Sequence, residues 1–257
     1  MGMTLPRTHF PQLRGMACVT VLLLGLLPLQ AMADKIRIAV ASNFAPALAD
    51  IAKLFEQQSP HKVLLSSGST GKHYAQIING APFDLFFAAD THRPELLDVQ
   101  ELIVKNSRFT YAQGRLVLWN PLGGNAEQKL HNASFERLAI ANPRLAPYGR
   151  AAQQTLQYLG LWQQLQKKLV RGENISQAYQ FTHSGSAQLG LVALAQLRNP
   201  NHPVRGSTWL VPENHYAPIR QQAVQLSDNE AAGQFLGFIK SPTALAIIER
   251  YGYGVPR

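Results

Sequence analysis

The sequence predicts an α/β fold with a parallel sheet, and two observations indicate it. Between residues 36 and 90, short apolar runs alternate with stretches whose apolar residues have helical spacing. The turns between them fall on Ser, Asn, Gly or Pro, which favour turns and helix starts. This order predicts parallel strands joined by right-handed crossovers. The expected strands are 36–41, 62–65 and 83–90, and the expected helices are 44–58 and a segment ending near residue 78.

The second half of the chain continues the alternation. Asn142 and Pro143 end one strand, and Gly160 ends the helix that follows it. We find no internal repeat and no low-complexity segment. The expected strands or extended runs are 115–119, 138–141, 189–194, 209–212 and 219–226, and the expected helices are 146–159, 178–183, 230–239 and 242–248.

Residues 1–33 have the pattern of a signal peptide. Arg7 and Arg14 form a basic flank, residues 18–29 are apolar, and residues 31–33 give a small-x-small cleavage pattern. The apolar run is too short to span a bilayer comfortably. We therefore expect an exported protein that starts near Asp34.

The composition of the exported chain argues against several kinds of site and partner. The only cysteine, Cys18, lies in the predicted signal peptide, so we expect no disulfide and no thiolate site. Removing Arg7 and Arg14 from the 24 basic residues leaves 22 against 15 acidic ones, a net charge of +7. The basic residues are scattered and not interleaved with aromatics, which argues against nucleic acid as a partner. A small anion remains compatible with this charge.

Two strand ends carry residues suited to holding an anion. Ser42 and Asn43 follow the first strand, and the segment 66–74, rich in Ser and Gly, follows the second. Ser42 and Asn43 are also good N-cap residues, so helix capping alone is an alternative explanation. Ligands of open parallel sheets bind at the carboxyl ends of the strands, so two such turns on consecutive units favour one shared site.

Catalytic and metal motifs fit the sequence poorly. Gly71-Lys72 is not part of a phosphate loop, because Ser66 stands where that motif needs Gly and His73 where it needs Ser or Thr. Lys72 is interpreted as a solvated residue. The chain has no Gly-x-Ser-x-Gly elbow and no histidine pair with metal-site spacing. We interpret six histidines in polar, loop-like stretches as surface residues: His73, His92, His131, His183, His202 and His215.

The motifs together resemble one family over nearly the whole exported chain. The segments 39–44, 66–77, 80–90, 142–149, 189–196 and 251–253 are similar to those of periplasmic molybdate-binding proteins of ABC importers, the ModA family. The resemblance implies a type II periplasmic binding protein, with two α/β lobes, a hinge and a ligand cleft between the lobes. It places lobe 1 at 34–112 and 222–257 and lobe 2 at 113–221.

The resemblance also assigns binding positions. It implies that oxyanion oxygens are contacted by Ser42, Asn43, Ser69, Thr70, Tyr148 and Ile175. These residues would contact molybdate oxygens and not the metal itself. Ser69 and Thr70 are alternatives for one position, and Tyr148 and Ile175 would donate through the backbone. Some members use a tyrosine hydroxyl where this chain has Ala193.

The family would supply no enzyme activity and no cofactor other than the ligand, molybdate or tungstate. Its partner would be a membrane permease, and we expect a monomer. Two alternatives stay open: a receptor for sulfate, thiosulfate or another oxyanion with the same fold, and an exported serine hydrolase using Ser69 or Ser184 with a histidine.

Overall fold

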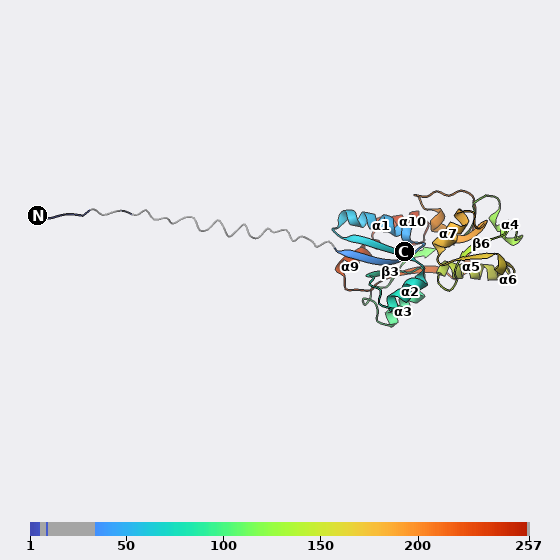
Figure 1. Ribbon diagram of the computed structural model, residues 1–257, viewed down its shortest axis with the longest axis horizontal. Coiled ribbons are helices and arrows are strands. Elements are labelled where there is room, and N and C mark those ends of the chain that lie inside the picture. Colours follow the sequence, from blue (N-terminus) through green and yellow to red (C-terminus); the bar gives the residue numbers. More distant parts are fainter. Residues whose placement is uncertain (6–8, 10–33, 256–257) are drawn as a thin grey trace. The chain divides into compact units, whose positions relative to one another are not determined.

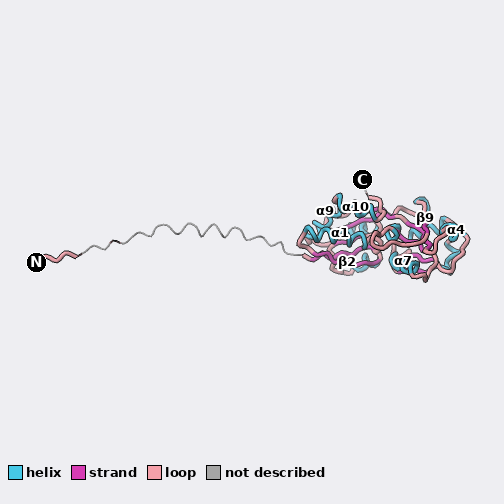
Figure 2. The backbone as a smooth tube through the Cα atoms, turned by 90° about the horizontal axis from the view of Figure 1, so that it is seen from above, coloured by secondary structure: helices cyan, strands magenta, loops and turns pink. Residues whose placement is uncertain are grey.

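The computed structural model describes residues 1–5, 9 and 34–255. Most of the predicted signal peptide, including its apolar run and cleavage pattern, lies outside the described residues. The chain from residue 33 onward forms one compact unit that contains two five-stranded sheets. Figures 1 and 2 both show one group of helices around each sheet. The structure is therefore a two-lobe α/β protein, as predicted.

The first sheet has the strand order β2-β1-β3-β10-β4. Strands β1, β2 and β3 are parallel, whereas β10 runs antiparallel to both of its neighbours. The strands are β1 Lys35–Ala41, β2 Lys62–Gly68, β3 Leu85–Phe87, β4 Phe109–Gly114 and β10 Ile219–Gln225.

The second sheet has the order β7-β6-β8-β5-β9. Strands β7, β6 and β8 are parallel, and β5 is antiparallel to both β8 and β9. The strands are β5 Leu116–Asn120, β6 Leu138–Ala141, β7 Leu169–Gly172, β8 Leu189–Ala193 and β9 Ser207–Leu210.

Helices cover both sheets and bury their apolar faces. In the first lobe they are α1 Ala45–Gln58, α2 Thr70–Ile78, α3 His92–Val99, α9 Glu230–Ile239 and α10 Pro242–Arg250. The second lobe contains α4 Ala126–His131, α5 Pro147–Tyr158, α6 Trp162–Leu165, α7 Ile175–His183 and α8 Leu194–Leu197. Among the described residues no single helix is long and apolar enough to cross a membrane.

The chain passes between the sheets twice. Gly114 ends β4 in the first sheet and Leu116 begins β5 in the second, while β9 is followed by β10 on the way back. The predicted lobe boundaries at 112/113 and 221/222 fall inside β4 and β10. Those boundaries stay a prediction.

The structure corrects several local expectations. Strand β3 is shorter than the expected strand at 83–90, and β4 and β7 were not among the expected strands. The short helices α3, α4, α6 and α8 were not predicted. Strand β2 extends through Ser66 and Ser67 to Gly68, so the turn before α2 consists of Ser69 alone. His73 is not a surface residue: its side chain is buried beside Phe83 and Phe86. Lys72 and Gln76 are exposed, so the polar sequence around this residue gives no sign that the ring is buried.

Candidate functional site

All six residues assigned by resemblance line one small cavity. Its first-lobe wall comes from the ends of β1 and β2 and from Ala89 after β3. Its second-lobe wall comes from the N-termini of α5 and α7. No charged side chain lines the cavity, which consists of Ala41, Ser42, Asn43, Gly68, Ser69, Thr70, Ala89, Ala146, Pro147, Tyr148, Asn174 and Ile175.

The turn after β1 leaves its polar groups free of a capping role. Helix α1 begins at Ala45 with Phe44 at the N-cap, and no side chain caps it. Helix capping, the alternative explanation for Ser42 and Asn43, is therefore wrong. The Asn43 side-chain amide instead donates to Gln221 Oε1 at 2.8 Å and to the Tyr253 hydroxyl at 3.1 Å. The Asn43 residue lines the cavity, and its backbone N–H has no acceptor among the described residues.

Ser69 and Thr70 both use their hydroxyl oxygens as acceptors. Ser69 Oγ, at the N-cap of α2, accepts from the Lys72 backbone N–H at 3.4 Å. Thr70 Oγ1 accepts from the Ala89 backbone N–H at 3.1 Å. Because a hydroxyl can accept and donate at once, each retains a proton for an anion. The choice between the two residues stays open.

The second lobe contributes the first turns of two helices to the cavity. Tyr148 follows Pro147 in the first turn of α5, and Ile175 is the first residue of α7. Asn174 caps α7 by accepting from the Gln177 N–H at 3.1 Å. The Tyr148 hydroxyl is buried, which raises the pKa of this phenol well above its ordinary value.

Five backbone donors at this cavity lack a protein acceptor. In the described part of the chain, no hydrogen bond satisfies the N–H groups of Asn43, Ser69, Thr70, Tyr148 and Ile175. Four of them lie in the N-terminal turns of α2, α5 and α7 or at the cap of α2. The first N–H groups of a helix carry partial positive charge, so this arrangement favours an anion.

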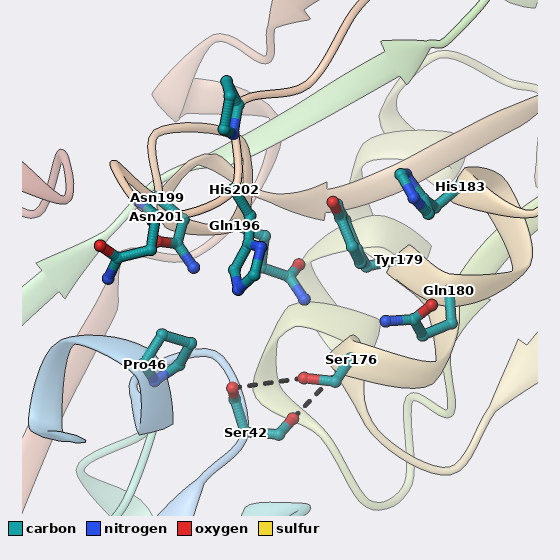
Figure 3. A pocket seen from close by; sticks show the side chains of 11 residues that line it. Ser42, Pro46, Ser176, Tyr179, Gln180, His183, Gln196, Asn199, Asn201 and His202 are labelled. Atoms are coloured by element: carbon teal, nitrogen blue, oxygen red, sulfur yellow. Dashed lines mark hydrogen bonds between the residues drawn. The ribbon is translucent and has the colours of Figure 1, made fainter.

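Direct contacts between the lobes surround the cavity. Ser176 donates its backbone N–H to Ser42 Oγ at 3.4 Å and its hydroxyl to Ser42 O at 3.3 Å (Figure 3). The Gly71 N–H donates to Leu145 O at 2.9 Å. These bonds hold the two walls of the cavity together.

Lys72 is a solvated residue, as predicted, and it also forms an ion pair. Its Nζ lies 3.2 Å from Glu173 Oε1, so this residue joins α2 to the turn before α7. Both side chains are substantially exposed, and such pairs contribute little to stability.

Two glutamines that the sequence did not indicate form hydrogen bonds to residues that line the cavity. Gln221 in β10 accepts from Asn43 and, at 3.1 Å, from the Tyr111 hydroxyl. Gln196 donates to Ile175 O at 3.2 Å and accepts from the Ala193 N–H at 3.0 Å. Ala193 itself is buried at the end of β8 and is not part of the cavity lining. No sequence pattern links these glutamines to partners so distant along the chain.

A larger cavity, of about 480 Å³, lies on the other side of the Ser42–Ser176 pair. Amide, hydroxyl and aromatic side chains line it, among them Tyr179, His183 and Asn201 (Figure 3). It carries no acidic or lysine and arginine side chains.

The hydrolase and metal alternatives find little geometric support. Ser184 Oγ is exposed and contacts Ser186 Oγ and Phe181 O rather than a histidine. Ser69 is bonded to the Lys72 N–H. Across residues 34–255 and the few described before them, no group of three His, Cys, Asp or Glu residues is placed to hold a metal ion.

Comparison with known proteins places the chain in a family. The model of the bacterial extracellular solute-binding proteins matches residues 36–254. The molybdate-binding protein ModA of Azotobacter vinelandii is 46% identical over 90% of this chain and 94% of its own length. ModA of Rhodobacter capsulatus is 42% identical over 96% of this chain and 98% of its own.

A solved structure agrees with these relatives. The periplasmic molybdate-binding protein of Azotobacter vinelandii superposes with a TM-score of 0.83 at 43% identity, covering 86% of this chain and all of its own. The chain therefore belongs to the bacterial extracellular solute-binding proteins and, within them, to the molybdate-binding ModA family.

Proposed function

We propose that this chain captures molybdate or tungstate in the small cavity and holds it with neutral hydrogen-bond donors. The observation that carries this proposal is the set of five unsatisfied backbone N–H groups around a cavity without a charged side chain. The hydroxyls of Ser42 and of Ser69 or Thr70 add donors to the same set. Neutral donors at helix N-termini stabilise a dianion without a countercharge.

The donor set also determines which anions are rejected. A cavity that offers donors suits fully ionised molybdate, tungstate or sulfate. A protonated anion such as hydrogen phosphate carries an O–H that would need an acceptor. Sulfate is smaller than molybdate and tungstate. The protein must therefore distinguish these anions by size, through the distance between the two cavity walls.

The relatives are named for binding molybdate, which favours a binding role over catalysis. We propose that the exported protein is a monomer in the periplasm, has no enzyme activity and no cofactor, and delivers the anion to an ABC permease. Closure of the lobes would present one shape to that permease. The signal peptide at 1–33 is part of this proposal.

Titration calorimetry of the purified protein with molybdate, tungstate, sulfate and phosphate tests the function. We expect saturable binding of molybdate and tungstate, much weaker binding of sulfate, and none of phosphate. A preference for sulfate or thiosulfate would establish the alternative receptor. Binding of none of these anions would contradict the proposal.

A further inference from the structure

A second cavity adjoins the small one and has a different charge. The two share Ala89 and Pro147 in their linings. This outer cavity has a volume of about 190 Å³, and its other lining residues come from the segment after β3, from α5 and from the segment leading into β10. Arg150 and Arg220 are among them.

The two arginines differ from the other cations around the cleft. Lys72 is paired with Glu173, and Arg93 is paired with Asp90, the one acidic residue in the outer-cavity lining. Arg150 and Arg220 are exposed, and neither forms a salt bridge within the described residues. The outer cavity therefore carries positive charge that no protein carboxylate neutralises.

Arg150 belongs to a helix that lines the small cavity, and Arg220 belongs to a strand that is hydrogen-bonded to a cavity residue. Arg150 lies in the first turn of α5, two residues after Tyr148. Arg220 lies in β10, the strand that follows the passage between the lobes, next to Gln221. Both charges therefore lie in the cavity next to the small one.

We propose that the outer cavity is an access site where dianionic oxyanions first dock before they enter the small cavity. The inference rests on the proposed oxyanion function. Neutral donors act only at hydrogen-bond distance, whereas two cations attract a dianion over about a Debye length, roughly 8 to 10 Å at physiological salt. Charges that line a cleft in this way raise association rates by about 10 to 1,000-fold. The arginines thus set the rate of capture, and the neutral cavity sets retention and selectivity.

Stopped-flow measurement of molybdate binding tests the access site. In the Arg150→Gln/Arg220→Gln variant, we expect the association rate constant at low salt to fall about tenfold. The dissociation rate constant should stay within about twofold, because neither side chain lines the small cavity. In 1 M NaCl, where the Debye length is about 3 Å, the two proteins should associate at similar rates.

Two further variants keep the test decisive. Lys53→Gln/Lys167→Gln removes the same net charge from exposed positions that line neither cavity, and it should leave the rate nearly unchanged. Arg150→Lys/Arg220→Lys keeps the charge and should keep most of the rate. The access site is overturned if Arg150→Gln/Arg220→Gln associates as fast as the wild type or as Lys53→Gln/Lys167→Gln. If the wild type binds no molybdate, the proposed function itself fails.

Discussion

The side-chain amide of Asn43 donates a 2.8 Å hydrogen bond to Oε1 of Gln221, 178 residues later in the chain. Gln221 is fully buried in β10, and the same oxygen accepts from the Tyr111 hydroxyl in β4. The turn after β1 is therefore fixed against the two strands that adjoin the passages between the lobes. Asn43 lies before the N-cap of α1, and this buried network holds its side chain in place.

Replacing Gln221 should weaken both the fold and the anion site. Gln221→Leu leaves buried polar partners unsatisfied, which costs about 1 to 3 kcal/mol. We expect a lower free energy of unfolding in urea without ligand and roughly tenfold weaker molybdate binding by calorimetry, since about 1.4 kcal/mol corresponds to tenfold. Gln234→Leu, at an exposed position of α9, is the control. Unchanged binding in Gln221→Leu would show that the network does not position Asn43.

Gly114 makes room for the side chain that orients the start of α5. A Cβ atom at Gly114 would overlap the Tyr148 hydroxyl and lie 2.9 Å from Gln221 Nε2. Gly114→Ala should therefore displace Tyr148, destabilise the protein by about 1 to 3 kcal/mol and weaken molybdate binding. Thermal unfolding and calorimetry measure these effects.

A matched glycine and a second substitution separate the causes. Gly237→Ala, in α9 with no atom near the added Cβ, should be neutral or stabilising by about 0.5 to 1 kcal/mol. Adding Tyr148→Phe to Gly114→Ala removes the overlapping hydroxyl and should restore part of the affinity. If the affinity is not restored, the loss of binding in Gly114→Ala has another cause than the overlap with the Tyr148 hydroxyl.

Single substitutions can decide between Ser69 and Thr70. Ser69→Ala removes the α2 cap, and Thr70→Val removes the acceptor of the Ala89 N–H, so each costs about 1 kcal/mol or more without ligand. If Ser69 contacts the anion, Ser69→Ala should weaken molybdate binding at least tenfold and Thr70→Val only about threefold. The reverse order would assign the contact to Thr70.

The two serines should act together in the first-lobe wall. Ser42→Ala combined with Ser69→Ala is expected to weaken molybdate binding further than either change alone while the cooperative unfolding transition remains. Circular dichroism reports the fold, and calorimetry reports the affinity. Unchanged affinity in the double variant would mean that these turns do not hold the anion.

Elements with a strong local pattern could be predicted from the sequence. Strand β6 lies at 138–141 as expected, because its apolar residues are bounded by polar turns. Short helices such as α3 lack this signal, since only Pro94 and Leu97 are buried there. The support that Gln196 and Gln221 give to the cavity depends on tertiary contacts, and no local pattern contains it.

His73 is a buried group whose protonation should couple pH to stability. Its Nδ1 lies 3.0 Å from Gln76 Oε1, and its Nε2 is buried without a partner in the described part of the chain. Burial is the main cause that lowers the pKa of this imidazole below its ordinary value. The ring also lies against Gly68, directly before Ser69.

The sign of the pH effect follows from which state binds the proton. As the pH falls below about 6.5, the unfolded chain protonates His73 while the folded chain does not, so the free energy of unfolding decreases. The slope is at most about 1.4 kcal/mol per pH unit. Urea unfolding between pH 7.5 and 5.5 should show this loss in the wild type and a smaller loss in His73→Gln. His92→Gln, at an exposed position, should keep the wild-type slope, and an equal slope in His73→Gln would assign the pH dependence to other groups.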